Sequence, residues 1–128
     1  LHECQLSCAN YPGATETKII GNSVELSDAT ITDCNLAYAN FTGSTMVEVD
    51  FSGCRMSHAR LDGANLTGAI LVDCELHNIE ADRVTLNHAD LRGATLSGLD
   101  VRNIDMTGVK INLDQAATLL EEIGVDVT

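Results

Sequence analysis

The chain is poor in aromatic residues, in basic residues and in long apolar runs. Its 128 residues include two Phe, two Tyr and no Trp, so small and aliphatic side chains must build nearly all of any core. Lys and Arg number seven against 19 Asp and Glu, which gives a formal net charge of -12. Phosphate binding needs cations, so this balance argues against nucleic acid or an anionic membrane as a direct partner and favours a basic one.

No apolar run approaches the roughly 20 residues of a membrane-spanning helix, and the N-terminus lacks the cationic and apolar regions of a signal peptide. We therefore expect a soluble, cytoplasmic protein. Five Cys is an odd number, which suits free thiols in a reducing compartment better than a disulfide framework. For Cys4 and Cys8, structural thiols, a disulfide and a pair of ligands remain the alternatives.

What the sequence has instead is a repeat of five residues. In steps of five from Leu26 to Ile111, all 18 positions are apolar. In the column two residues earlier, 17 of 18 positions are apolar, and Ser44 is the exception. The other three columns are nearly all polar, with Ile70, Ala37, Val47, Val72 and Tyr38 as the breaks. Gly often stands two residues after the centre, so the unit reads A-(D/N)-L-(S/T)-G.

A period of five fits neither a helix nor a long strand, because both would scatter the apolar centres over different faces. The chain must turn a corner every five residues, and Gly suits such a corner because turns often require a positive φ. Four units then make one square turn of about 20 residues, so positions 20 apart should stack. Cys34, Cys54 and Cys74 are predicted to form a thiol ladder inside this coil.

This pattern resembles that of the pentapeptide-repeat proteins, most clearly at residues 64–68 (ANLTG) and 89–93 (ADLRG). The resemblance implies an all-β fold, a right-handed quadrilateral β-helix, over residues 24–111. Residues 1–23 are interpreted as an irregular first coil and loop, with Pro12 to Ser23 off the pattern. Residues 112–128 are interpreted as a helix followed by a short extended tail.

The C-terminal segment carries helix signals. Asn112 or Asp114 is a candidate N-cap and Gly124 is a stop signal. The apolar stripe expected to cap the last coil consists of Leu113, Ala116, Ala117, Leu120 and Ile123. Leu119 lies off this stripe and leaves apolar surface for a second contact.

This ending also resembles the C-terminus of Qnr-type proteins, the quinolone-resistance branch of the family. The resemblance implies a homodimer, with an interface at Leu119, Leu120, Ile123, Val125 and Val127. It also implies a bacterial protein. Capping of the coil alone is the alternative role for this segment.

The sequence shows no converging nucleophile, base and orienting group, so we expect no enzyme, no catalytic residues, no cofactor and no metal site. His58 and His77 fall on neighbouring coils of one face, where they could approach each other. A solvated surface pair is the simpler interpretation.

The remaining signal is the distribution of charge over the four predicted faces. Two adjoining faces are expected to carry the partner-binding acids, which are Glu25, Asp28, Glu48 and Asp105 on one and Asp33, Asp50, Asp73 and Asp90 on the other. The first of these faces has no Lys or Arg, and the second has Arg92 and Lys110. Another face mixes Arg60, Arg83 and Arg102 with acids.

The resemblance to Qnr-type proteins implies a dimeric acidic rod that mimics duplex DNA and binds a type II topoisomerase such as gyrase, protecting it from quinolones or toxins. The leading hypothesis is therefore a non-catalytic rod of this kind, whose binding weakens steeply with salt. The alternative is a structural or protein-interaction scaffold with another partner, in which the charge serves solubility.

Overall fold

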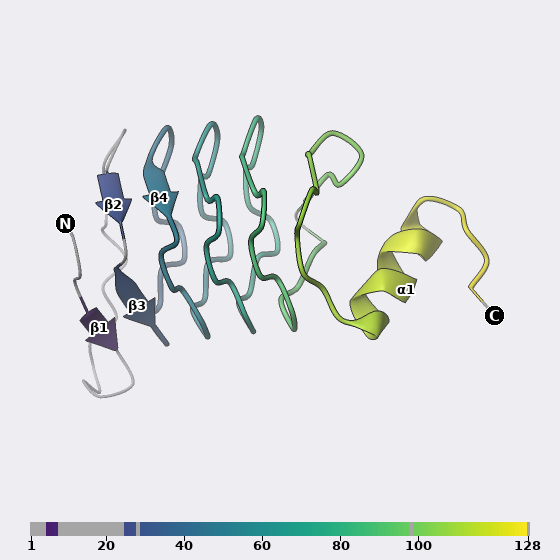
Figure 1. Cartoon of the computed structure of the whole chain (residues 1–128), viewed down its shortest axis with the longest axis horizontal. Coiled ribbons are helices and arrows are strands. Elements are labelled where there is room, and N and C mark those ends of the chain that lie inside the picture. The colour runs from purple at the N-terminus through teal and green to yellow at the C-terminus, as the bar shows by residue number, and fades with distance from the viewer. Residues whose placement is uncertain (1–4, 8–24, 28, 98, 128) are drawn as a thin grey trace.

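The computed structural model describes residues 5–7, 25–27, 29–97 and 99–127. The chain winds into coils that stack along the long axis of the molecule, with the N-terminal strands at one end and the helix at the other (Figure 1). The elements are β1 (Gln5–Ser7), β2 (Glu25–Ser27), β3 (Thr30–Thr32), β4 (Thr45–Val47) and α1 (Leu113–Glu122).

Residues 20 apart pair in parallel, as predicted. β2 pairs with β4 so that Leu26 lies beside Met46. Single bridges continue the same register up the stack: Thr30 to Asp50 to Ile70 to Asp90 to Lys110, Asn35 to Arg55 to Glu75, Asn40 to Arg60 to Glu80, and Thr45 to Asn65 to Thr85. These four columns define four sides of the coil.

We name the sides by their described residues. The first acidic face comprises residues 44–48, 64–68, 84–88 and 104–108. The second acidic face comprises 29–33, 49–53, 69–73 and 89–93. The third face comprises 34–38, 54–58, 74–78 and 94–97, and the fourth comprises 39–43, 59–63, 79–83 and 99–103.

The first coil is longer than the others. β1 pairs with β3 in a register that places Leu6 beside Ile31, which is a separation of 25 residues. The separation is therefore five residues longer than in the other coils. The predicted loop from Pro12 to Ser23 lies outside the described residues.

Most of the described corners are closed by a turn in which the central carbonyl accepts a hydrogen bond from the N–H three residues on. Leu36 and Ala39 make this bond at 3.0 Å. The third residue of the turn has a positive φ, as a type II turn requires. Gly63, with φ +68°, adopts this conformation without strain, whereas Tyr38 adopts it at φ +65° despite its bulk.

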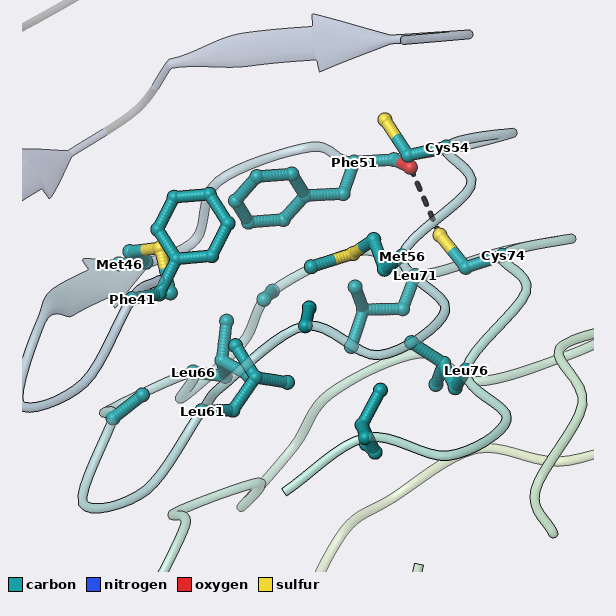
Figure 2. Packing of buried hydrophobic residues seen from close by; sticks show 14 of the residues in the cluster. Phe41, Met46, Phe51, Cys54, Met56, Leu61, Leu66, Leu71, Cys74 and Leu76 are labelled. Carbon is teal, nitrogen blue, oxygen red and sulfur yellow. Dashed lines mark hydrogen bonds between the residues drawn. The ribbon is translucent and has the colours of Figure 1, made fainter. Parts of the chain in front are cut away.

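The inward positions form one continuous core (Figure 2). Phe41 and Phe51, from opposite sides of the coil, meet edge to face with ring centroids 6.1 Å apart. In the column where Leu61 is followed by the smaller Ala81, the neighbouring inward position changes from Ala59 to Ile79. The two columns therefore share one volume, as close packing requires.

The cysteine column lies inside the coil, but it is not a ladder of three thiols. The carbonyls of Cys34 and Cys54 accept hydrogen bonds from the next coil at 2.9 and 3.1 Å, so the three residues stack. Cys54 and Cys74 are buried free thiols, but Cys34 is disulfide-bonded, and its partner lies outside the described residues. The expectation of a free thiol at Cys34 is therefore wrong, because an odd number of Cys excludes complete pairing but not one disulfide.

The two free thiols are protected chemically as well as sterically. Each thiol donates to a backbone carbonyl of the preceding coil at 2.9 Å, Cys54 to that of Ile31. Figure 2 shows the other bond, from Cys74 to Phe51. Burial raises the pKa of Cys54 to about 11 and that of Cys74 to about 12. Both stay protonated and unreactive near neutral pH.

The last coil is less regular than those before it. The backbone N–H of Leu76 donates to the hydroxyl of Thr95 at 2.7 Å instead of to a backbone carbonyl. Within the described residues, the ladder of backbone hydrogen bonds is then interrupted along the fourth face and resumes where His88 donates to Thr107. Val101 and Met106 are only half-buried.

Helix α1 begins and ends as its sequence predicts. The side chain of Asn112 accepts from the N–H of Gln115 at 3.0 Å, and the side chain of Gln115 accepts from the N–H of Asn112 at 2.8 Å. This capping box is followed at the other end by Gly124, whose φ is +94°.

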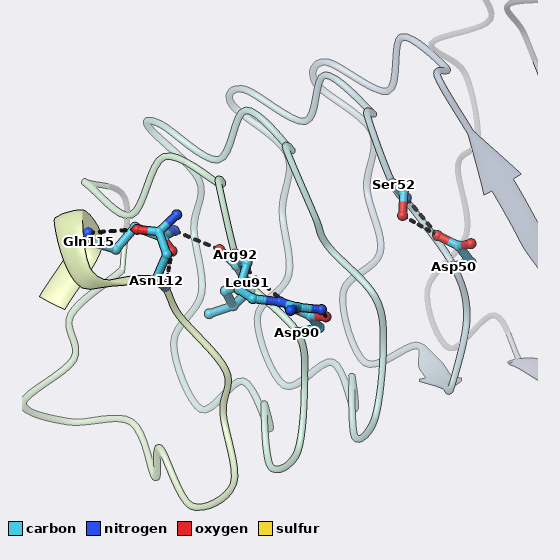
Figure 3. A network of polar contacts seen from close by, with 7 residues as sticks. All are labelled: Asp50, Ser52, Asp90, Leu91, Arg92, Asn112 and Gln115. Carbon is cyan, nitrogen blue, oxygen red and sulfur yellow. Dashed lines mark hydrogen bonds and ion pairs between the residues drawn. The ribbon is translucent and has the colours of Figure 1, made fainter.

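Gln115 also joins the helix to the coil. Its side-chain N–H₂ donates to the carbonyl of Leu91 at 2.6 Å (Figure 3) and to that of Ala94 at 2.9 Å. In earlier coils the corresponding carbonyl, that of Cys74, accepts from the backbone N–H of Thr95, 21 residues further on. Gln115 is the residue 21 positions after Ala94. Its own backbone N–H is engaged in the capping box, so its side chain donates to the Ala94 carbonyl instead.

The apolar stripe predicted for the helix is not the one that contacts the coil. Leu119, expected to point away, packs against the core cluster, whereas Leu113 is 88% exposed. Leu120 and Ile123 are exposed as well. The expected stripe is wrong because the bonds of Gln115 fix the rotation of the helix about its axis.

Candidate protein-interaction surface

The predicted acids of the second acidic face lie at two kinds of position. Asp50 and Asp90 belong to one column, separated by Ile70, and both are half-buried. Asp33 and Asp73 stand at the corner and are exposed. Each of the four segments of this face therefore adds one carboxylate to the same side of the rod.

The corner acids are held in place by the coil that follows them. A Cβ added to Gly53 would clash with the Oδ1 atom of Asp33, and one added to Gly93 would clash with the Oδ1 atom of Asp73. Each carboxylate therefore lies over the glycine 20 residues further on. A bulky corner residue followed by Gly at a spacing of 20 is a signal that the sequence contains and that the prediction overlooked.

The same arrangement occurs on the first acidic face. The side chain of Glu48 lies over Gly68, and the ring of His88 lies over Gly108. Asp105, the remaining described acid of this face, accepts hydrogen bonds from Thr107 and Asn87, which lower the pKa of its carboxyl. The side chain of Glu25 and the whole of Asp28 are outside the described residues.

Asp90 differs from the other acids of its face because it is paired. Its two carboxylate oxygens accept from Arg92, Oδ1 from Nε at 2.9 Å and Oδ2 from an Nη at 2.6 Å (Figure 3). The bond with Arg92 lowers the pKa of Asp90, and the nearby charge of Lys110 adds to this effect. Asp90 therefore presents little net charge to a partner.

Asp50 is oriented without being neutralised. Its Oδ1 accepts from the backbone N–H of Ser52 at 2.9 Å and from the Ser52 hydroxyl at 2.6 Å (Figure 3). No Lys, Arg or His forms an ion pair with it among the described residues. The charge therefore remains available, and the turn fixes its position.

Arginines are concentrated on the other two faces. Arg55 pairs with Glu75 at 3.0 Å on the third face, and Arg60 pairs with Glu80 at 3.2 Å on the fourth. Each pair joins residues 20 apart. A further contact joins Arg83 to Asp82 at 3.9 Å. Most of the described basic residues therefore lie on the two faces that are not predicted to bind a partner.

We define the acidic patch as Asp33, Glu48, Asp50 and Asp73. Within the part of the chain that the structure describes, none of these four residues forms a salt bridge. They belong to two adjoining faces and lie between residues 33 and 73. A rigid backbone therefore displays four uncompensated charges on neighbouring sides.

The predicted histidine pair is replaced by a different contact. The ring of His58 stacks on that of Tyr38, with centroids 4.7 Å apart and an interplanar angle of 10°. His58 meets His77 only through the backbone, where its N–H donates to the His77 carbonyl at 3.2 Å. Tyr38 is 70% exposed, so the stack lies on the surface.

The predicted dimer residues are divided by the structure. Leu119 packs within its own chain, whereas Leu120, Ile123, Val125 and Val127 are each between 41% and 45% exposed. Residues 125–127 form no strand. Four apolar side chains of the predicted interface are thus accessible to a second molecule.

No set of catalytic or metal-binding groups converges in the described residues. No group of three or more His, Cys, Asp and Glu could hold a metal ion among them. A groove of about 310 Å³ lies between α1 and residues 94–97, and its lining includes Leu96, Leu119 and Glu122. The described residues include no helix with the length and apolar character that a membrane span needs.

The sequence matches a model of pentapeptide repeats (eight copies) over residues 25–63, 59–98 and 69–108. No curated protein matches it. Among solved structures, the chain is similar to a pentapeptide repeat protein, Rfr23, from the cyanobacterium Cyanothece 51142. The two chains are 21% identical, with a TM-score of 0.66 over 89% of this chain and 84% of that one.

Two further structures are more distant. HetL, a protein involved in heterocyst differentiation regulation in Nostoc sp. strain PCC 7120, is 21% identical, with a TM-score of 0.42 over 67% of this chain and 38% of that one. QnrB1, a plasmid-mediated fluoroquinolone resistance protein, is 24% identical, with a TM-score of 0.39 over 85% and 72%. Proteins with these repeats fold as right-handed β-helices and are generally non-catalytic scaffolds. From the repeat and the family match, this chain belongs to the pentapeptide-repeat family.

Proposed function

We propose that this chain is a non-catalytic acidic rod that binds a basic, DNA-handling protein surface in the place of duplex DNA. The partner that we propose is a type II topoisomerase, gyrase, which the rod would protect from quinolones or toxins. The rod would act as a homodimer, joined through the exposed residues Leu120, Ile123, Val125 and Val127 together with Leu119.

The observation that carries this proposal is the segregation of charge. Arg55 and Arg60 pair with Glu75 and Glu80 on the third and fourth faces, while the acidic patch forms no salt bridge in the described chain. Like charges held on a rigid rod repel each other, and a basic groove on a partner would relieve that repulsion. The resemblance of the C-terminal segment to Qnr-type proteins supports gyrase as the partner to test.

The test is displacement of DNA from purified gyrase, with supercoiling measured with and without a quinolone. We expect wild-type protein to compete with DNA at low salt, and the affinity to fall steeply as salt rises. No competition at micromolar protein and low salt would contradict the proposal.

A matched pair of variants separates the patch from total charge. The patch variant carries Asp33→Asn, Asp50→Asn and Asp73→Asn. The control carries Asp62→Asn, Asp82→Asn and Asp100→Asn on the fourth face, so both variants lose three negative charges. We expect the patch variant to lose affinity on the order of tenfold while the control stays close to wild type. Equal losses would indicate that only net charge matters.

The alternative is a scaffold for another protein. The exposed apolar side chains at the C-terminal end favour it, because such surface is suited to association with a protein. The affinity of a scaffold for its partner would depend little on salt, whereas the affinity of a DNA mimic would fall steeply as salt rises.

A further inference from the structure

The second acidic face is interrupted by an apolar pair. Ile70 and Val72 flank Leu71, which is buried, so both side chains point outward from the same unit. In the described coils, no other unit has an apolar residue on each side of its central residue. The pair stands in columns that otherwise carry polar and charged residues.

Charged and polar residues flank this pair in the coils before and after it. Ile70 lies in the column between Asp50 and Asp90. Val72 lies between the coils of Ser52 and Arg92, because its carbonyl accepts from Gly53 at 2.8 Å and Asp73 donates to the Arg92 carbonyl at 3.1 Å. Ile70 and Val72 are half-buried by these neighbours, so their exposed surface is an apolar centre within a charged rim.

A surface that only imitated phosphate charge would gain nothing from this interruption. Aliphatic side chains in the column between two aspartates lower the density of charge where a purely electrostatic mimic needs it. Protein interfaces, in contrast, have an apolar centre depleted of charge and a polar rim, and a few central residues supply most of the affinity. The arrangement around Ile70 and Val72 has this form.

We propose that Ile70 and Val72 are the central contact for a basic protein segment that places one aliphatic or aromatic side chain on them. The cationic residues on either side of that side chain would reach Asp50 and Asp73, which have no cation of their own in the described chain. The negative rim selects a basic segment by charge complementarity, and the apolar centre distinguishes a protein from DNA. This inference rests on the proposed function only where it names gyrase as the partner.

The first experiment uses two synthetic peptides of equal charge. In one, a leucine stands between two runs of lysine, and in the other a serine replaces that leucine. We expect the leucine peptide to bind wild-type protein several-fold more tightly and to shift the methyl NMR signals of Ile70 and Val72. Equal affinity for the two peptides, or no shift of these signals, would overturn the inference.

The second experiment uses substitutions and salt dependence. The variant Ile70→Thr with Val72→Thr keeps β-branched side chains and should lose roughly tenfold or more in affinity for the leucine peptide and for gyrase. The slope of affinity against salt should stay unchanged, because no charge is altered. The control is Val47→Thr, an outward valine of β4, which should bind as wild type does. A change in the slope, or an equal loss in the control, would count against the inference.

Two further arms keep the result clear. If the double variant does not fold, as judged by its thermal transition, Val72→Thr alone is measured with the same peptides and the same criteria. If wild type binds gyrase and the double variant binds it equally well, the apolar contact is wrong while the proposed function stands. If wild type does not bind gyrase but discriminates between the peptides through Ile70 and Val72, the proposed function fails and the contact stands.

Discussion

The middle coils and the last coil are built from the same unit of five residues, yet they are stabilised differently. In the middle coils each unit has a neighbour on both sides, and Leu66 is completely buried. In the last coil the backbone ladder is interrupted, Met106 is half-buried, and a side chain of α1 supplies missing donors. The difference shows that a unit of this repeat is stable through its neighbours more than through itself.

The largest expected contrast is between two core truncations. Leu66→Ala should lower the free energy of unfolding by about 2–5 kcal/mol, because it leaves a cavity between two well-packed coils. Met106→Ala should cost about 1–2 kcal/mol, since part of that side chain already contacts water. Urea unfolding of both variants measures the contrast. Equal costs would mean that the last coil is as well packed as the middle.

The next effect concerns the bond between helix and coil. Gln115→Ala should cost about 1–3 kcal/mol, because the carbonyls of Leu91 and Ala94 lose a donor and the capping box is broken. Hydrogen exchange should become faster in the last coil and in α1, while the middle coils stay protected. Thr118→Ala, an exposed change on the same helix, is the control. Faster exchange throughout the chain would contradict a local role.

A smaller effect separates two glycines of similar backbone conformation. Gly63→Ala should cost roughly 1 kcal/mol, because its φ of +68° disfavours a side chain although nothing lies within 4 Å of the new Cβ. Gly93→Ala should cost more, because Asp73 must move as well. The double variant Gly93→Ala with Asp73→Ala should return to the cost of Gly63→Ala. A double variant no better than Gly93→Ala would exclude the contact as the cause.

The smallest effect is a pH dependence of the stability of the fold that arises from Asp90. Since the pKa of Asp90 is lowered in the folded chain, its carboxylate stabilises the fold above the unfolded value of about 3.9. This contribution should be lost as the pH falls below that value. Asp90→Asn should therefore be less stable than wild type at pH 7 and closer to it at pH 3, measured by urea unfolding. Asp50→Asn, at a site without an arginine partner, is the comparison, and an equal response would contradict the role of Arg92.

Much of the fold was predictable because the repeat encodes both the inward columns and the turn. The stacking of residues 20 apart follows from the period, and Asn112 was one of the two candidate N-caps, although the part that Gln115 plays in the cap was not predicted. The rotation of α1 was not predictable from helical spacing, because it depends on which carbonyls of the last coil lack donors. The disulfide at Cys34 was not predicted either, because the number of cysteines does not show whether one pair is bonded.

The candidate surface was only partly predictable for a similar reason. Counting charges by face located the acids, and the structure shows which of them are compensated. Asp90 and Arg92 are two residues apart in the sequence, and their pairing depends on side-chain directions that the period alone does not specify. Ile70 and Val72 stood out as breaks in the polar columns, but their position within a charged rim became visible only from the stacked coils.

The corner aspartates limit how this surface can change. Because the carboxylate at such a corner occupies the space above the next glycine, a second acid cannot follow in the adjacent coil without displacing the first. Along the edge formed by Asp33, Gly53, Asp73 and Gly93, negative charges therefore recur every second coil, a pitch of about 9.6 Å. A partner that reads this edge must space its cations to the same pitch, and lengthening the rod would add binding positions in steps of 40 residues.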